Sequence, residues 1–278
     1  MDLLDLDDIS RAIQARHLCT PLPVADAVHP SDRVEDASAR LRARQFDAAP
    51  VLEGLAPIGI FHAARRGDGE TVRDVMQPLT AAVMVSADTA VGELVQHLRH
   101  EPFLFVLKGR RVVGFVTPAD LGSAPARTHY YLLLAALEIL LAQLLRVTHR
   151  DQSTALGLLS KTARERHARI VAELRSNDEY LDDIAALSLA DLIFLAGKGP
   201  DFRKEACSAG CGWNWLQDGI VKFRNDVMHP ARDFTRASGS GIQKLAEFDS
   251  RLTTLAQAAE ACLHPRESAQ TNPSPASH

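Results

Sequence analysis

The first half of this chain contains an internal repeat, and that repeat limits the folds open to it. The segment VHPSDRVEDASARLRARQFDAAPVLEGLAPIGIFHAAR follows the same order of features as VSADTAVGELVQHLRHEPFLFVLKGRRVVGFVTPAD. Each copy has a turn with Ser and Asp, an amphipathic helical stretch, a β-rich run, a turn, and a second run in which Gly precedes two apolar residues. Because a repeated sequence folds into a repeated unit, we expect an α+β region of two repeats, each with a helix followed by two strands.

The sequence changes character near residue 122. Beyond it almost everything reads as helix, beginning with the apolar run YYLLLAALEILLAQLLRV at 130–147. Ser188 and Asp191 have the spacing of a capping box, and Gly197 stands where that helix would end. We therefore expect an N-terminal helix or linker at 1–17, the repeat pair at 18–122, an all-α helical bundle at 123–265, and a polar, Pro- and Ser-rich disordered tail at 266–278.

The repeat resembles a tandem pair of CBS domains, in which the last strand is typically followed by Gly, two apolar residues, Ser or Thr, and an Asp three positions later. The second copy matches with GFVTPAD at 114–120. The resemblance implies an α+β pair of two βαββα-type repeats. It also implies that this pair is a regulatory module in which Thr117 and Asp120 bind the phosphate and ribose of an adenine nucleotide: ATP, ADP or AMP. A carboxylate accepts hydrogen bonds from both ribose hydroxyls, while a hydroxyl and backbone groups at a helix start can meet phosphate.

The first copy reads GIFHAAR and places His62 and Arg65 at the matching positions. It lacks the carboxylate, so we expect at most one nucleotide site per chain. An alternative without a ligand is that Thr117 and Asp120 only cap the next helix, because Thr followed by Pro is a common helix start. Both roles use the same groups and can coexist.

A second pattern lies near the end of the chain, in KFRNDVMHPARDF at 222–234. Asn225 and His229 are four residues apart, so on a helix they share a face and the amide can orient the imidazole. Pro230 disfavours a helical conformation at the residue before it, so we expect the helix to end at His229 and the imidazole to turn toward Arg224. A permanent cation beside a titratable imidazole suits phosphodiester chemistry.

This segment and its helical surroundings resemble the HEPN domain family, whose signature is Arg, four to six residues, then His. The resemblance implies a homodimeric, metal-independent endoribonuclease with RNA as its substrate; other members of the family are interaction modules. Arg224 would stabilise charge on the phosphate, Asn225 would orient His229, and His229 would move the proton of an attacking 2′-hydroxyl. The alternative is a helix end at which Arg224 forms a surface ion pair with Asp226 or Asp218.

Charge gives divided support for RNA binding. The net charge of −4 is not that of a general RNA-binding protein. Residues 146–175 are locally basic, and we weigh a path for a phosphate backbone equally against a solvated face with pairs such as Arg169 and Glu173. Trp213 and Trp215 could stack on bases, with one of them expected in the core. The basic residues of this stretch are Arg146, Arg150, Lys161, Arg164, Arg166, Arg169 and Arg175.

The sequence also allows predictions of the cellular location and of metal binding. The acidic start MDLLDLDDISRAI lacks the basic and apolar parts of a secretory signal, so we expect a cytoplasmic protein. Cys207 and Cys211 supply only two of the four ligands that zinc requires, so we expect no metal site. The run at 130–147 carries Glu138 and Gln143, which favours a buried helix at a domain or dimer interface over a membrane span.

Two hypotheses follow. The first is a nucleotide-regulated, metal-independent endoribonuclease, in which the repeat pair senses an adenine nucleotide and a helical homodimer cleaves RNA. The second is a non-catalytic, nucleotide-sensing dimerisation or interaction protein.

Overall fold

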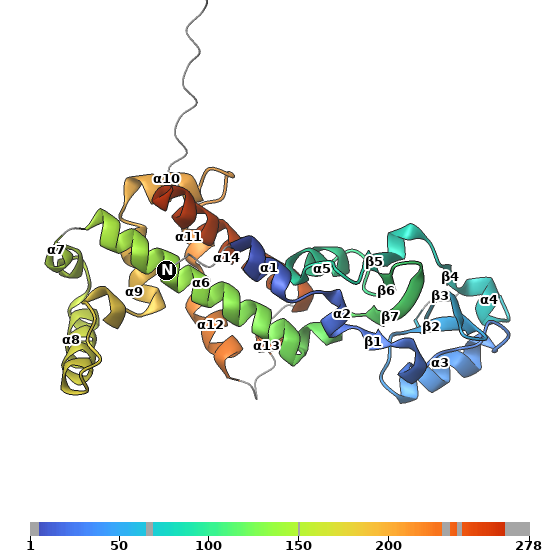
Figure 1. The fold of residues 1–278 in the computed structure, drawn as a ribbon. Helices are drawn as coiled ribbons and strands as arrows, with labels where there is room; N and C mark the ends of the chain where they lie inside the picture. Colours follow the sequence, from blue (N-terminus) through green and yellow to red (C-terminus); the bar gives the residue numbers. More distant parts are fainter. Residues whose placement is uncertain (1–5, 65–68, 150, 230–233, 238–240, 265–278) are drawn as a thin grey trace, which may run out of the picture. The chain divides into compact units, whose positions relative to one another are not determined.

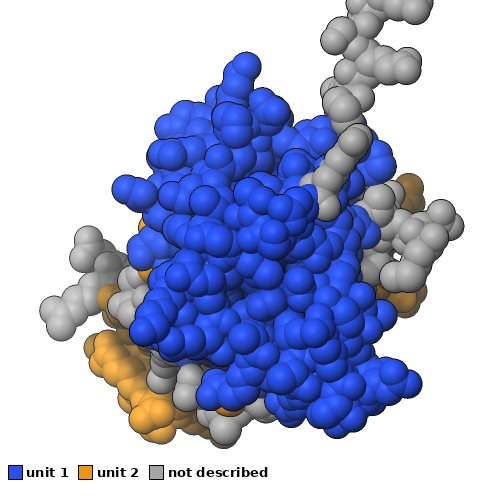
Figure 2. All heavy atoms as spheres, turned by 90° about the vertical axis from the view of Figure 1, so that its left-hand side faces the viewer, with its two compact units in different colours: residues 1–6, 131–228, 248–278 blue, residues 7–130, 229–247 orange. Residues whose placement is uncertain are grey.

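The computed structural model describes residues 6–64, 69–149, 151–229, 234–237 and 241–264. The chain forms two compact units (Figure 2). The first, here the sheet unit, comprises Asp7–Tyr130 and His229–Glu247. The second, here the helical unit, comprises Met1–Leu6, Tyr131–Met228 and Phe248–His278. The tail predicted to be disordered, at 266–278, lies outside the described residues.

The sheet unit contains the two repeats, and each described helix and strand of the first has a counterpart in the second (Figure 1). The structure extends each repeat at its N-terminal side by a short helix and a two-residue strand. After α1 (Leu6–Ala12), the first repeat consists of α2 (Ala15–Leu18), β1 (Thr20–Pro21), η1 (Leu22–Val24), α3 (Val34–Ala43), β2 (Ala48–Glu53) and β3 (Ala56–His62). The second consists of α4 (Val72–Val75), β4 (Gln77–Pro78), η2 (Ala81–Val83), β5 (Met84–Ser86), α5 (Val91–Leu98), β6 (Leu104–Lys108), β7 (Arg111–Val116) and η3 (Pro118–Gly122).

The strands form two sheets, and each sheet contains a strand of the other repeat. One sheet has the order β1-β7-β6-β5 and the other β2-β3-β4. The first-repeat strand β1 pairs antiparallel with β7, and the second-repeat strand β4 pairs antiparallel with β3. In the second repeat β5 pairs parallel with β6. At the equivalent place in the first repeat there is one parallel bridge, between Val28 and Val51. Neither repeat therefore completes its own sheet.

The two hairpins turn at equivalent glycines. Gly54 has φ of +63° and Gly109 has φ of +61°, and each opens a two-residue turn. Glycine reaches positive φ without the steric cost that a Cβ imposes, and hairpin turns require that conformation. Register shifts follow Val51 and Val106, again at equivalent positions. The repetition seen in the sequence thus extends to details of the backbone.

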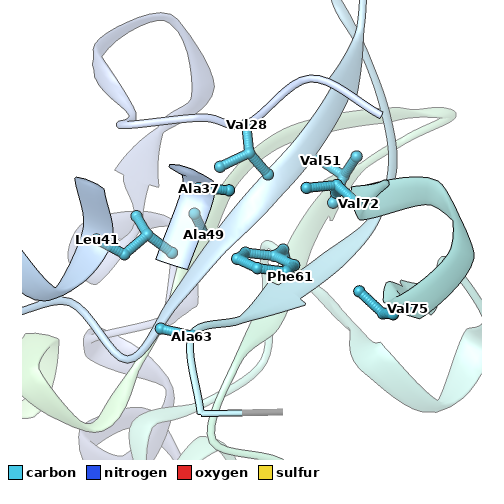
Figure 3. Close-up of a cluster of buried hydrophobic side chains, with 9 residues drawn as sticks. All are labelled: Val28, Ala37, Leu41, Ala49, Val51, Phe61, Ala63, Val72 and Val75. Carbon is cyan, nitrogen blue, oxygen red and sulfur yellow. The ribbon is translucent and has the colours of Figure 1, made fainter. Parts of the chain in front are cut away.

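Two apolar clusters hold the repeats together. Figure 3 shows the first cluster, in which α3 of the first repeat and α4 of the second cover β2 and β3 around the fully buried ring of Phe61. A second cluster joins the repeats, because Ile60 of β3 packs with Val83, Phe103 and Phe105 of the second repeat. Burial of a side chain of this size stabilises a fold by about 1.5–3 kcal/mol relative to its exposure.

Three further segments complete the sheet unit. These are the start of α6 (Ala124–Thr148), the short helix α13 (Phe234–Ala237) and the start of α14 (Gly241–Leu263). The buried rings of Tyr130 and Phe234 meet edge to face, with centroids 5.8 Å apart. α13 also packs against η3.

The C-terminal region is largely helical. Besides α6 and α14, the helical unit contains α7 (Gln152–Gly157), α8 (Lys161–Ser176), η4 (Ile184–Ala186), α9 (Leu189–Ala196), α10 (Pro200–Ala206), α11 (Trp213–Gln217) and α12 (Ile220–Met228). The predicted capping box of Ser188 and Asp191 is confirmed at the start of α9, and Gly197 follows its last residue. A Cβ at Gly197 would lie 2.1 Å from the Trp213 ring, which explains glycine there.

α6 is long and apolar enough to cross a membrane by length and composition alone. Its leucines are mostly buried within the structure, as the sequence predicts for a core helix. The leucines that expose less than a tenth of their surface are Leu133, Leu134, Leu137, Leu140, Leu141, Leu144 and Leu145. Tyr131 and Ile139 are exposed on the same helix, by 47% and 39% of their surface.

Candidate functional site

Thr117 and Asp120 form a tight hydrogen-bonded turn after β7. Asp120 Oδ2 accepts hydrogen bonds from the Thr117 backbone N–H at 2.7 Å and from Thr117 Oγ1 at 3.0 Å. Pro118 is in the first turn of η3, and Thr117 is the N-cap of this helix. Thr117 and Asp120 together form a capping box. The predicted capping role is confirmed. It leaves the ligand-binding role open, because both use the same groups.

A third side chain joins this turn from the start of the other repeat. Thr20 lies opposite Phe115 in the β1–β7 pair, and Thr20 Oγ1 donates to Asp120 Oδ1 at 3.4 Å. Close approach of the two strands depends on Gly114, where a Cβ would lie 2.4 Å from the Thr20 carbonyl oxygen. We call Thr20, Thr117 and Asp120 the acidic turn cluster.

The acidic turn cluster has an unusual electrostatic balance. Burial raises the pKa of Asp120, while the hydrogen bonds from Thr117 and Thr20 act in the opposite direction. Burial, and next the charge on Asp120, also raise the pKa of the neighbouring Cys19 thiol. A half-buried carboxylate that lacks full solvation is a strong acceptor for further hydroxyl donors. Its two oxygens can accept about four hydrogen bonds, and they accept three here, from the Thr117 N–H, the Thr117 hydroxyl and the Thr20 hydroxyl.

The equivalent place in the first repeat has different chemistry. His62 ends β3, and its Nε2 lies 3.1 Å from Gln77 Oε1 on β4. Gln77 occupies the strand position that Thr20 has in the other repeat. The other residue expected at this place, Arg65, lies outside the described residues. The described groups here are a neutral amide and an imidazole, without a carboxylate at the position of Asp120.

The sequence prediction missed Thr20. A signal for it exists, because Cys-Thr-Pro at 19–21 and Met-Gln-Pro at 76–78 stand equally far before Val28 and Val85, where the recognised repeats begin. Extending both copies to these tripeptides would have placed a strand there. It would not have shown that this strand pairs with the other repeat.

The Arg-His segment is divided between the two units. α12 ends at Met228 and His229 follows it as an exposed residue, so the predicted helix end is confirmed. Half-buried Arg224 and exposed Asn225 lie on α12 in the helical unit, whereas His229 belongs to the sheet unit. The predicted approach of the His229 imidazole to Arg224 stays a prediction.

Arg224 forms an ion pair, but not with a partner named from the sequence. Its Nε lies 3.5 Å from Glu138 Oε1 on α6, and both side chains keep about a third of their surface exposed, 38% and 33%. The sequence correctly suggested an ion pair of Arg224 as the structural alternative, but the partner is Glu138 and not Asp218 or Asp226. Asp218 Oδ2 lies 4.0 Å from Arg251 instead, and Asp226 is buried. Residues close in sequence were favoured because the packing of α12 against α6 could not be foreseen.

His229 is held through its backbone. Arg127 Nη1, from the first turn of α6, donates to the His229 carbonyl oxygen at 3.2 Å. The guanidinium carbon of Arg127 also lies 4.7 Å from the centroid of the Phe234 ring. These contacts leave the imidazole exposed while its main chain is fixed.

Most basic side chains of residues 146–175 are engaged within the helical unit. Arg146 forms two hydrogen bonds with Asp182, at 2.6 and 3.1 Å, and Arg166 binds Asp191 at 2.6 Å. Arg164 donates to the Leu159 carbonyl at 2.6 Å, and Arg175 stacks on Tyr180 at 4.4 Å. Arg150 lies outside the described residues. This pattern favours the structural alternative over a path for RNA.

The two tryptophans also have structural contacts. Trp213 meets Phe202 edge to face at 5.8 Å and packs on Gly197. Trp215 is 36% exposed, and the buried Arg251 guanidinium lies 4.5 Å from its ring centroid. Trp213 is half-buried and Trp215 is exposed, so the expectation that one tryptophan belongs to the core is not confirmed.

The helical unit also contains a cavity of about 770 Å³. It lies between the end of α6, the α9–α10 connection and the end of α14, and its walls are mainly apolar, with Lys198, Lys204, Asp201 and Glu205 among the polar lining residues. None of the site residues predicted from the sequence lines it.

Comparison with known proteins identifies one domain. Residues 72–126 match the CBS domain family, so a CBS domain occupies that stretch. The CBS-pair protein CBSX2 from Arabidopsis thaliana is 18% identical, with 39% of this chain and 91% of that chain covered and a TM-score of 0.34. The CBS domain of a bacterial CNNM/CorC family Mg²⁺ transporter, solved in complex with ATP, is 19% identical, with 45% and 92% covered and a TM-score of 0.36.

A zinc metalloprotease of Methanocaldococcus jannaschii is 27% identical over 124 residues. The match covers 43% of this chain and 34% of that protein, so the chain spans about a third of the length of the curated relative it matches. In the described part of the chain, no group of three or more His, Cys, Asp and Glu side chains is placed to hold a metal ion. The resemblance of residues 123–265 to the HEPN family stays a prediction.

Proposed function

We propose that this chain is a nucleotide sensor, in which the CBS pair binds one adenine nucleotide at the acidic turn cluster. The observation that carries the proposal is the half-buried carboxylate of Asp120, which lies between Thr117 and Thr20 at the junction of the two repeats. The ribose 2′- and 3′-hydroxyls donate to Asp120, and the Thr117 hydroxyl donates to a phosphate oxygen.

The long contact from Thr20 is the one that a ligand displaces most readily. At 3.4 Å it is weaker than the bonds from Thr117, at 2.7 and 3.0 Å. A ribose hydroxyl that takes its place gains a charge-assisted hydrogen bond, worth more than a neutral one. The capping bond from the Thr117 backbone N–H to Oδ2 persists, while the Thr117 hydroxyl turns its single proton from Oδ2 to the phosphate, so the ligand binds to a turn that is already ordered.

Calorimetry with AMP, ADP and ATP tests this proposal. We expect about one site per chain, lost in Asp120→Ala and retained in His62→Ala, the variant at the equivalent position of the first repeat. AMP lacking the 2′- or 3′-hydroxyl should bind wild type more weakly than AMP does, because it lacks one donor to Asp120. Equal affinity of wild type and Asp120→Ala for AMP would reject the site.

A second candidate function, cleavage of RNA, is favoured by the Arg-His segment. An exposed imidazole with an anchored backbone directly follows a helix that carries Arg224 and Asn225. In the reaction, His229 takes the proton of the 2′-hydroxyl, the 2′-oxygen attacks phosphorus, and the bond from phosphorus to the 5′-oxygen breaks. The leaving oxygen takes up a proton, and a 2′,3′-cyclic phosphate remains. Arg224 stabilises the charge that grows on the phosphate oxygens.

Both functions use a homodimer. α6 exposes Tyr131 and Ile139 although most of its leucines are buried, and a second copy would cover this surface. For the second function the dimer brings two Arg-His segments together in one cleft. If RNA is not cleaved, the same surfaces serve a sensor that recruits another protein.

A further inference from the structure

The acidic turn cluster and His229 are connected through one short stretch of backbone. The Ser123 N–H donates to the Asp120 carbonyl oxygen at 3.1 Å, and the Arg127 N–H donates to the Ser123 carbonyl oxygen at 3.0 Å. Thus η3 continues into α6 by hydrogen bonds, and Arg127 lies seven residues after Asp120. All of these residues belong to the sheet unit.

The Arg127 side chain carries this connection across to His229. Nη1 donates to the His229 carbonyl oxygen at 3.2 Å, and the guanidinium lies over the Phe234 ring at 4.7 Å. Phe234 is fully buried, and its helix α13 packs against η3. Arg127 therefore contacts the chain at His229 and at Phe234, and both contacts originate from an element that directly follows the acidic turn cluster.

We propose that Arg127 is a positioning residue that couples nucleotide binding at Asp120 to the setting of His229. The inference rests on the proposed nucleotide site and deepens it by naming the route of regulation. A ribose that draws Asp120 away from Thr20 shifts η3, the first turns of α6 move with it, and the guanidinium carries the His229 carbonyl along. The coupling requires that the nucleotide bind the two arrangements with different affinity.

The choice of arginine fits this role. Its planar guanidinium stacks on an aromatic face and donates in its own plane at the same time. Lysine keeps the charge and N–H donors but loses the stacked plane, and glutamine keeps N–H donors without the charge. A graded response, from arginine through lysine to glutamine, separates positioning from general loss of charge.

Nuclear magnetic resonance of the full-length protein tests the coupling without an activity assay. The His229 ring signals are assigned by their loss in His229→Gln, and AMP is added to wild type, Arg127→Lys and Arg127→Gln. We expect AMP to move the His229 ring signals in wild type. The response falls to less than half in Arg127→Gln and is intermediate in Arg127→Lys.

Arg99→Gln is the matched control. Arg99 follows the last residue of α5 in the same unit and donates to Gln243 of α14 at 2.8 Å; it makes none of the hydrogen bonds that connect Asp120 to His229, so its variant keeps the full response. A full response in Arg127→Gln, or bound AMP with His229 signals unmoved in wild type, overturns the coupling and leaves the nucleotide site standing. Absence of AMP binding by calorimetry overturns both. Where Arg127→Gln fails to fold, judged by circular dichroism, Arg127→Lys decides.

Discussion

Thr20 Oγ1 donates to Asp120 Oδ1 at 3.4 Å, although the two residues are 100 positions apart in the chain. The contact exists because β1, the first strand of the first repeat, pairs with β7, the last strand of the second. A ligand bound at this place therefore reports on the assembled pair and not on one repeat. The same exchange, in the opposite direction, brings Gln77 to His62.

Gly114→Ala and Gly59→Ala separate damage to the nucleotide site from damage to the fold. A Cβ would lie 2.4 Å from the Thr20 carbonyl oxygen at Gly114 and 2.5 Å from the Gln77 carbonyl oxygen at Gly59. Both variants must push a strand aside, and we expect each to lose about 1–3 kcal/mol of stability in denaturant unfolding. Only Gly114→Ala should weaken AMP binding, because only it displaces Thr20. Equal loss of affinity in both variants would argue for a different site.

Nucleoside binding should weaken as the pH falls. Burial raises the pKa of Asp120 above its ordinary value of 3.8, and only the ionised form accepts from both ribose hydroxyls. Affinity therefore declines on acidification at a higher pH than an ordinary aspartate would give. Adenosine is the proper probe, because a nucleotide phosphate itself titrates near pH 6. Calorimetry between about pH 7 and pH 4.5 measures the effect, and a flat profile over that range would contradict it.

The raised pKa of Asp120 also makes the stability of the fold depend on pH. A raised carboxyl pKa means that the folded state holds the proton more tightly than the unfolded state does. Its contribution to stability is present below the unfolded pKa and is lost as the pH rises through the folded pKa. At neutral pH the ionised Asp120 is thus a cost that the fold bears, which is typical of a site kept for binding.

The repeat made much of the sheet unit predictable from the sequence. Helix and strand periodicity and the GFVTPAD segment were enough to locate Thr117 and Asp120 at the end of a strand, because these are local signals. The pairing of β1 with β7 was not predictable, since a two-residue strand has no periodicity and its partner is set by packing of the whole pair. Thr20 was missed for that reason.

The helical unit was harder to read. The capping box at Ser188 and the helix end before Pro230 follow from local backbone preferences and were predicted correctly. The Arg224 partner was wrong, because Glu138 is distant in sequence and only the packing of α6 on α12 brings it near. In the same way Arg146 pairs with Asp182, 36 residues away. The sequence of the basic stretch alone therefore did not show that the charge of Arg146 is neutralised.

Dimerisation should depend on the exposed apolar residues of α6. We expect light scattering to show a dimer at micromolar concentration. Ile139→Asp should raise the dimer dissociation constant at least about tenfold, because a loss of about 1.4 kcal/mol of binding free energy is enough for that change. Leu181→Asp is the control, because Leu181 is 81% exposed but lies outside α6. A monomeric wild type, or equal weakening by both variants, would remove α6 as the interface.

RNA cleavage, if the second candidate function holds, should need the Arg-His segment. His229→Ala and Arg224→Ala should each reduce the rate about 10²–10³-fold, and Asn225→Ala less, because it only orients the imidazole. Cleavage should persist in chelator, leave a 2′,3′-cyclic phosphate, and stop when the cut position is 2′-deoxy. A pure preparation that leaves varied RNAs intact, with and without AMP, ADP and ATP, would favour the non-catalytic sensor.

Glu138→Gln distinguishes a working Arg224 from a structural one. Arg224 must leave Glu138 to bind a phosphate, and their 3.5 Å ion pair at one-third exposure opposes that step. Such a pair is worth about 0–1 kcal/mol, so its removal should raise kcat/KM for RNA by up to about fivefold. The gain should vanish in the double variant with Arg224→Ala, because the released guanidinium is then absent. If Arg224 is only structural, Glu138→Gln lowers stability slightly in denaturant unfolding and leaves kcat/KM unchanged.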